Sequence, residues 1–185
     1  MNQDVRRKTI QEMDGALDFL RKELASLRTG RASLSMLDGV MVDYLGVPTP
    51  LAQVAALAVP EGRLLTIQPW ESRLISEIEK AIMTSGLGLN PTNDGKVIRL
   101  AIPQLTEERR KELAKVAKKM AEEGRVAIRS IRRDANDELK KLEKQKGLPE
   151  DDVRKAQEDI QKTTDQYIQK VDDLLKKKEM EIMAV

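Results

Sequence analysis

The sequence predicts an α+β protein of two domains, in which an elongated three-helix bundle carries a small α+β domain inserted between its first and second helices. Apolar residues recur at helical spacing near both ends of the chain. Residues 30–104 differ, holding six of the seven prolines and seven of the ten glycines. A chain of 185 residues is long enough for two cores. We therefore expect segments 1–29 and 105–185 to form the bundle and 30–104 to form the inserted domain.

The first helix is expected over about residues 2–28. Its apolar residues alternate at spacings of three and four, which is the pattern of an amphipathic helix: Ile10, Met13, Leu17, Leu20, Leu24 and Leu27. Gly30 is expected to end this helix, because glycine adopts the left-handed conformation common at helix ends.

The inserted segment reads as short strands around one helix. "GVMVDYLG" alternates like a half-buried strand, and "VAALAVPEGRLLTIQPW" predicts a strand, a turn and a second strand. "ESRLISEIEKAIMTSG" follows as a helix, and two final strands flank a turn at Asp94-Gly95. Trp70 stands at a strand end, where it is expected to anchor the core of the domain.

Two long helices are expected after residue 105. The first begins at Thr106 as N-cap and ends near Gly147. Its expected buried stripe is Leu113, Val116, Met120, Ala127, Ile131, Ala135 and Leu142. The second follows Pro149, with acids in its first turn and the stripe Val153, Ala156, Ile160, Tyr167, Val171 and Leu174.

Composition excludes several classes of chemistry. The chain has no cysteine and no histidine, so disulfides, thiolate nucleophiles, Cys/His zinc sites and imidazole bases are excluded. "GLGLNP" lacks the third glycine of a dinucleotide loop, and "NPTNDG" has Ala101 where a calcium loop needs an acid. We expect no enzyme activity, no metal and no cofactor. The charged start and the prolines within 44–60 predict neither a secretory signal nor a spanning helix, so a cytoplasmic protein is expected.

The stretch "RVAIRSIRRDAN" concentrates positive charge in a chain of formal net charge +2. At roughly 100° per residue around Ile131, Arg125, Arg129, Arg132 and Arg133 should face away from the apolar stripe. The same sector collects lysines from Lys111 onward and one acid, Glu122.

Arginine is suited to planar, bidentate partners such as phosphate, so the stripe predicts contact with a nucleic-acid backbone. An ordinary solvated helix face stays open as the alternative, because lysine and arginine are good helix formers. With one Phe, two Tyr and one Trp, the chain has no platform for stacking unpaired bases.

Five segments carry a family resemblance: "RTGRAS" (28–33), "VPTPLAQ" (47–53), "EKAIMTSGLGLNP" (79–91), "LTEERRKEL" (105–113) and "RVAIRSIRRDAND" (125–137). In this order, over essentially the whole chain, they resemble the signature blocks of bacterial ribosome recycling factors. Ser130, Gly86 and Ala101 depart from the usual residues of that family, and none of them belongs to the arginine cluster.

The resemblance implies a function. Family members bind the large ribosomal subunit after termination. With elongation factor G and GTP hydrolysis by that partner, they split the ribosome and release mRNA and tRNA. The bundle contacts rRNA, and the small domain, where the GTPase acts, swings about a hinge. A monomer is implied.

Carried onto this chain, the resemblance makes Arg132 the foremost rRNA contact, supported by Arg129 and Arg133, with Arg28 and Arg31 at the hinge end of the first helix. Four further candidates depend more on the basic stripe than on the family: Arg125, Arg109, Arg110 and Lys111. The expected hinge residues are Gly30, Arg31, Pro103, Gln104 and Leu105.

Two other classes of function stay open from the residues alone. A coiled-coil adaptor would need an exposed apolar seam and would associate in solution. A hydrolase using carboxylates and lysines would show turnover without ribosomes.

Overall fold

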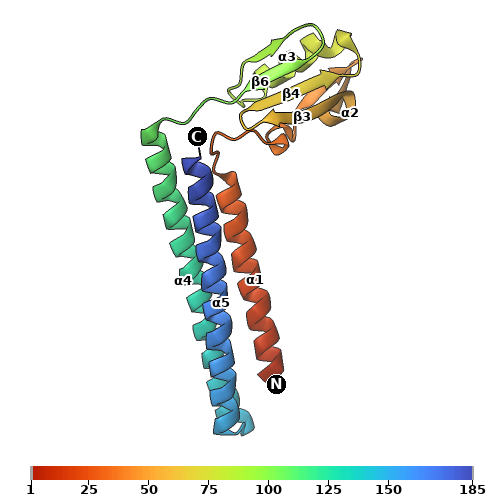
Figure 1. Cartoon of the computed structure of the whole chain (residues 1–185). Coiled ribbons are helices and arrows are strands. Elements are labelled where there is room, and N and C mark those ends of the chain that lie inside the picture. Colours follow the sequence, from red (N-terminus) through yellow and green to blue (C-terminus); the bar gives the residue numbers. More distant parts are fainter. Residues whose placement is uncertain (1, 185) are drawn as a thin grey trace. The chain divides into compact units, whose positions relative to one another are not determined.

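The computed structural model describes residues 2–184, which form two compact units (Figure 1). One unit comprises the described chain up to Thr29 and from Thr106 onward, and the other is Gly30–Leu105. The first is a helical bundle and the second contains a sheet, which confirms the predicted two-domain α+β class.

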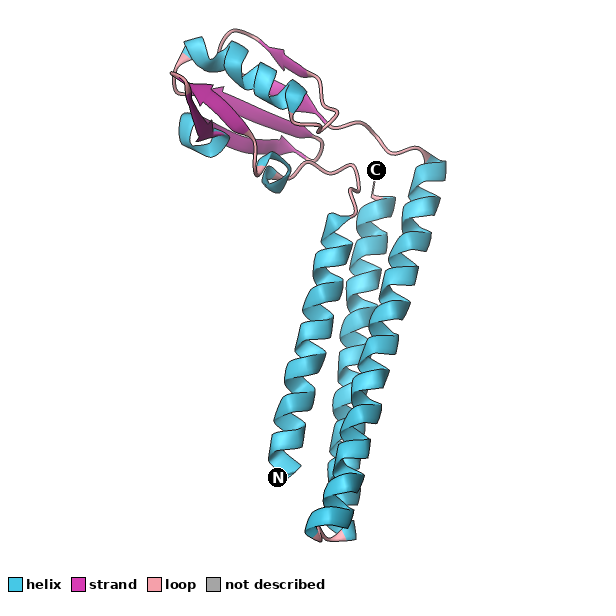
Figure 2. Cartoon of the chain, turned by 180° about the vertical axis from the view of Figure 1, so that it is seen from behind, coloured by secondary structure: helices cyan, strands magenta, loops and turns pink. Residues whose placement is uncertain are grey.

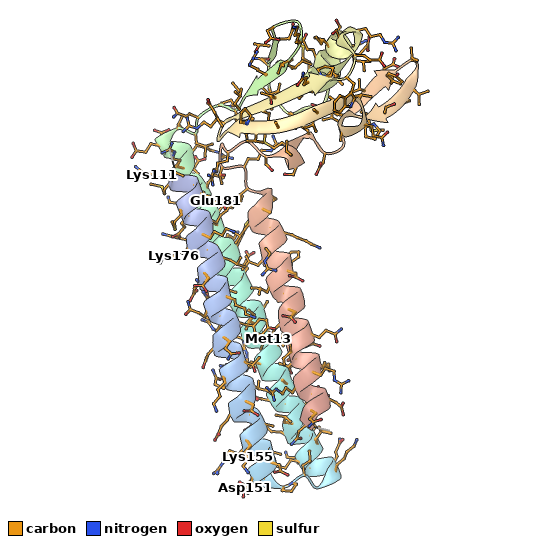
Figure 3. All side chains as sticks on the ribbon, turned by 45° about the vertical axis from the view of Figure 1, so that its right-hand side comes forward. Met13, Lys111, Asp151, Lys155, Lys176 and Glu181 are labelled. Atoms are coloured by element: carbon orange, nitrogen blue, oxygen red, sulfur yellow. The ribbon has the colours of Figure 1, made fainter. Side chains whose placement is uncertain are left out.

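The bundle consists of three helices that run side by side: α1 (Asn2–Ser26), α4 (Glu107–Lys146) and α5 (Glu150–Met183) (Figure 1). At 1.5 Å per residue, the 40 residues of α4 span about 60 Å. Met13 of α1, which is fully buried, lies between the helices about midway along the bundle (Figure 3). Buried side chains of all three helices also pack together in a cluster of Val5, Ala135, Leu139, Val153 and Ile160.

The ends of α4 follow the sequence signals. The Thr106 hydroxyl accepts a hydrogen bond from the backbone N–H of Arg109 at 3.2 Å, as an N-cap does. Gly147 closes the helix in the left-handed conformation, with φ +64°. The expectation for α1 was less accurate. This helix ends at Ser26, so Gly30, with φ +77°, lies beyond its end and does not cap it.

The buried face of α4 is turned relative to the expected stripe. Val116 is 40% exposed, and Met120, Ala127 and Ile131 are only half-buried. The buried positions are Leu113, Ala117, Ala121, Ile128, Ala135 and Leu139. Alanines lie at the centre because neighbouring helices approach closely there. A Cβ added at Gly124 would lie 3.1 Å from Cδ2 of Leu20 in α1.

The small unit is built on a four-stranded antiparallel sheet of order β3-β4-β6-β5. Its strands are β3 (Ala55–Glu61), β4 (Leu64–Pro69), β5 (Pro91–Asn93) and β6 (Ile98–Ala101). Helix α3 (Ile75–Thr84) lies on one face of this sheet (Figure 2). The core between them is aliphatic, with Leu65, Ile67, Ile98, Leu100, Ile78 and Ile82 all fully buried.

A separate hairpin joins β1 (Met41–Tyr44) to β2 (Val47–Pro50). It is followed by the one-turn helix α2 (Leu51–Val54), and 3₁₀ turns occur at Leu34–Leu37 and Ser72–Leu74. Strand β2 was not predicted, and it contains two prolines, Pro48 and Pro50. Both are tolerated here because β2 is an edge strand, paired on one side only.

Trp70 corrects the expectation of a core anchor, because its side chain is 68% exposed. In β4 the odd-numbered residues Leu65 and Ile67 point into the core. Trp70 continues the even-numbered set that points outward, just past the strand.

Candidate nucleic-acid interface

Helix α4 presents the predicted arginines in two different environments. Arg125 and Arg132 lie seven residues apart and both reach side chains of α5. Arg129 and Arg133 belong to the same stretch of α4, and their side chains point further from the core. The four residues share one region of α4, but they differ in how closely acidic side chains pair with them.

Arg125 is held inside the bundle, which corrects the expectation that it faces away from the core. Its side chain is only 19% exposed. Nε and Nη2 donate to Oδ1 of Asp172 in α5 at 2.9 and 2.7 Å, and Nη1 donates to Glu122 at 2.9 Å. Hydrogen bonding from Arg125 lowers the pKa of Glu122. The guanidinium of Arg125 thus joins α4 to α5 and its charge is matched by two carboxylates.

Arg132 is bonded to a neutral partner instead. Its Nη1 donates to Oε1 of Gln161 in α5 at 3.2 Å. Within residues 2–184 the guanidinium forms no ion pair, so its full positive charge is retained at a half-buried position. A cation held in this way can accept a phosphate without first losing a carboxylate.

Arg129 and Arg133 complete the cluster. Arg129 is 42% exposed and shares Glu122 with Arg125 through a longer contact of 3.4 Å. Arg133 is exposed, and its Nε lies 3.5 Å from the backbone oxygen of Arg129. Exposed pairs of this length contribute little, so both side chains are available to an external anion.

Two of the basic residues at the start of α4, Arg109 and Lys111, are exposed and paired with acids. Arg109 pairs with Glu112 at 2.9 Å and Lys111 pairs with Glu107 at 3.0 Å. Lys111 lies at the same end of the bundle as Glu181, opposite the end that carries Asp151 (Figure 3). Arg110 is half-buried, and its Nε is buried without a hydrogen-bond partner among the described residues.

The expected hinge residues lie where the chain enters and leaves the small unit. Gly30, with φ +77°, packs within that unit against Leu105, and a Cβ there would lie 3.5 Å from the carbonyl oxygen of Pro103. With its amide turned so that the oxygen faces Arg63, Gln104 accepts from that guanidinium. Arg31 is exposed, as is Arg28, which follows the end of α1 in the other unit.

Neither a metal centre nor a membrane span is found in the described part of the chain. Across residues 2–184, no three acidic side chains are grouped so as to hold a metal ion. Within the same range, no helix combines the length and the apolar character needed to cross a bilayer.

Comparison with known proteins decides the family. The family model described as ribosome recycling factor matches residues 20–183. The chain belongs to the ribosome recycling factor family. A ribosome-recycling factor from Nitratidesulfovibrio vulgaris is 59% identical over 175 residues, covering 95% of this chain and 94% of that protein. One from Syntrophomonas wolfei is 58% identical over 185 residues and covers both chains completely.

Solved structures of ribosome recycling factors agree with this fold. A solution structure of one is 40% identical and superposes with a TM-score of 0.74, covering all of this chain and 98% of that one. The T. thermophilus ribosome recycling factor is 46% identical, with a TM-score of 0.63 and complete coverage of both chains. That factor is described together with E. coli elongation factor G, bound to the E. coli post-termination complex.

Two partners of the arginines were not anticipated from the sequence: Asp172 and Gln161. Both lie on α5, 47 and 29 residues along the chain from the arginines they bond, and their pairing depends on how the two helices align. A heptad alignment of the two helices is the signal that could have paired them.

Proposed function

We propose that this protein binds the large ribosomal subunit after termination and, with elongation factor G, separates the post-termination ribosome into subunits. mRNA and tRNA are released for another round of translation. The observation that supports this proposal is full-length similarity to ribosome recycling factors, one of which is described with elongation factor G on a post-termination complex. GTP is hydrolysed by that partner. The protein itself acts as a cytoplasmic, monomeric binding factor without catalysis of its own.

The rRNA contact is assigned to the arginine face of α4, which we define as Arg129, Arg132 and Arg133. Its support is geometric. Arg132 is bonded to an amide, and the other two make only long contacts within the bundle. An RNA backbone supplies the phosphates that such arginines bind bidentately. We place Arg125 outside this contact because two carboxylates already hold it. Arg28, Arg31, Arg109, Arg110 and Lys111 are secondary candidates.

The hinge is assigned to the two connecting segments, with Gly30 and Arg31 on one and Pro103, Gln104 and Leu105 on the other. Transmitting force from a GTPase to rRNA requires the small domain to move while the bundle stays bound. Gly30→Cys and Gln104→Cys together would join the two connecting segments on oxidation. Because the natural chain has no cysteine, only this pair reacts, and the reduced form is its own control. The oxidised form should bind large subunits normally but split ribosomes slowly. An equal splitting rate would contradict a hinge in which the two connecting segments must move against each other.

The function is tested by pelleting the protein with isolated large and small subunits, and by following light scattering of post-termination ribosomes with elongation factor G and GTP. We expect preference for the large subunit and a loss of scattering that needs all three components. Binding to neither subunit would refute the proposal. Self-association in sedimentation at working concentration would favour an adaptor instead.

A further inference from the structure

Gln161 links Arg132 to α5 through two hydrogen bonds in series. Its Nε2 donates to Oδ1 of Asp165 at 2.9 Å, and its Oε1 accepts from Nη1 of Arg132 at 3.2 Å. The carboxylate can only accept, so it fixes which end of the amide is the oxygen. That oxygen then faces the guanidinium, which can only donate. The series therefore has one consistent direction, from arginine to amide to carboxylate.

The amide separates the positive charge of Arg132 from the negative charge of Asp165. At Arg125 the guanidinium meets carboxylates directly, at 2.7 Å to Asp172 and 2.9 Å to Glu122. At Arg132 the corresponding partner on α5 is uncharged, and one of five N–H donors is used on it. The side chain is thereby oriented without being paired to an acid, and within residues 2–184 its remaining donors stay free for an anion.

We infer that Gln161 is a positioning residue for the proposed RNA contact: it orients the Arg132 guanidinium while leaving its charge available to an RNA phosphate. This inference rests on the proposed function. The property of Gln161 that binding requires is then its lack of charge, rather than its size or helix propensity.

The test is Gln161→Glu, which keeps size and shape but places a carboxylate against Arg132. A matched control exists on the same helix. Gln169 donates from Nε2 to Oδ1 of Asp173 at 3.0 Å, and no arginine of the described chain bonds to its oxygen. Gln169→Glu therefore adds the same charge, loses the same hydrogen bond and creates the same pair of acids four residues apart.

Binding to large subunits should be titrated at several salt concentrations. We expect Gln161→Glu to weaken binding about two- to fivefold, the value of an exposed ion pair that must be given up. It should also flatten the dependence of log affinity on log salt by up to about 0.7–0.9, the contribution of one phosphate contact. Gln169→Glu should change affinity less than about twofold. Thermal midpoints of the two variants should shift alike.

The Arg132→Ala background separates the possible failures. If Gln161 acts through Arg132, Gln161→Glu adds no more than Gln169→Glu once the arginine is gone. Equal effects of the two glutamates in the natural background would overturn the inference while the RNA contact stands, provided that Arg132→Ala still weakens binding. If Arg132→Ala itself binds normally with an unchanged salt slope, the proposed contact fails, and the role of Gln161 with it.

Discussion

Two arginines of α4, one heptad apart, meet different kinds of partner on α5. The Arg125 side chain is 19% exposed, and its guanidinium lies between carboxylates of both helices. One heptad later, around Arg132, the guanidinium meets the amide of Gln161. The first region uses arginine to join the two helices, and the second leaves arginine without an ion pair among the described residues, at the position where we propose the RNA contact. The lesson is that the partner, rather than the charge of the residue, distinguishes a stabilising arginine from one that is proposed to bind.

Arg132→Ala should give the largest effect in binding and almost none in folding. Losing a charge-assisted hydrogen bond to phosphate costs about 1.5–3 kcal/mol, or roughly 10- to 100-fold in affinity for large subunits. Stability should stay within about 0.5 kcal/mol of the natural chain. Arg132→Lys should restore binding only in part, because an ammonium cannot form the bidentate contact.

A titration at several salt concentrations checks this, with Lys176→Ala on α5 as the control (Figure 3). An equal loss of affinity for Lys176→Ala would mean that the arginine face is an ordinary solvated surface.

Arg125→Ala should have the opposite pattern, with a clear loss of stability and little change in binding. Two ion pairs and the packing of the side-chain stem are lost, and we expect about 1–2 kcal/mol lower unfolding free energy, since the pairs are partly screened by water. Urea denaturation measures it, with Arg129→Ala as the exposed counterpart expected within about 0.5 kcal/mol. Affinity for large subunits should change less than about threefold. A tenfold loss of binding by a stably folded Arg125→Ala protein would erase the distinction between the two regions.

Tyr167→Phe tests whether the hydrogen bond between α5 and α1 stabilises the bundle, as the Arg125 contacts do. The Tyr167 hydroxyl of α5 donates to Asp14 of α1. Burial, then this hydrogen bond, raises the pKa of Tyr167 from 10.0 to about 12. The folded state therefore holds the proton more tightly than the unfolded state. The stabilisation is fully present below pH 10 and is lost as pH rises through about 12.

At neutral pH the phenylalanine variant should be less stable by about 1 kcal/mol, and that difference should shrink between pH 10 and 12. Chemical denaturation of both proteins across this range measures the difference. A constant difference over the whole range would contradict the assigned contact.

Glu122→Gln should give the smallest effect, and of opposite sign. This carboxylate pairs with both Arg125 and Arg129, and the hydrogen bond from Arg125 lowers its pKa. Removing its charge leaves Arg129 unpaired and adds one net positive charge, so affinity for large subunits should rise by up to about twofold. Weaker binding would mean that Glu122 orients the arginines rather than competing for them.

The architecture followed from the sequence where local chemistry determines it. Thr106 and Gly147 marked the ends of α4 because a hydroxyl cap and a left-handed glycine act on the helix they flank. The face of α4 that is buried was predicted only in part. Large residues such as Val116 and Ile131 suggested the buried face, whereas Ala117 and Ala121 occupy it because the neighbouring helices leave little room.

The arginine cluster was found from the sequence, but the state of each arginine was not. Spacing along one helix shows which residues share a face. It carries no information on whether Asp172 or Gln161 stands opposite, since this depends on the alignment of two helices. The prediction for Trp70 was wrong for a different reason. A large aromatic residue suggested a core position, although strand alternation from Leu65 and Ile67 already pointed it outward.

The exposure of Trp70 also makes the molecule convenient to observe. It is the one tryptophan of the chain and belongs to the small unit, while the bundle carries a tyrosine, Tyr167. Excitation at the red edge of protein absorption therefore reports on the small unit alone. Because the indole is 68% exposed, its emission should lie near that of tryptophan in water and should shift to the blue when another protein covers it. Docking of a partner on the small unit can thus be timed by stopped-flow fluorescence without attaching any label.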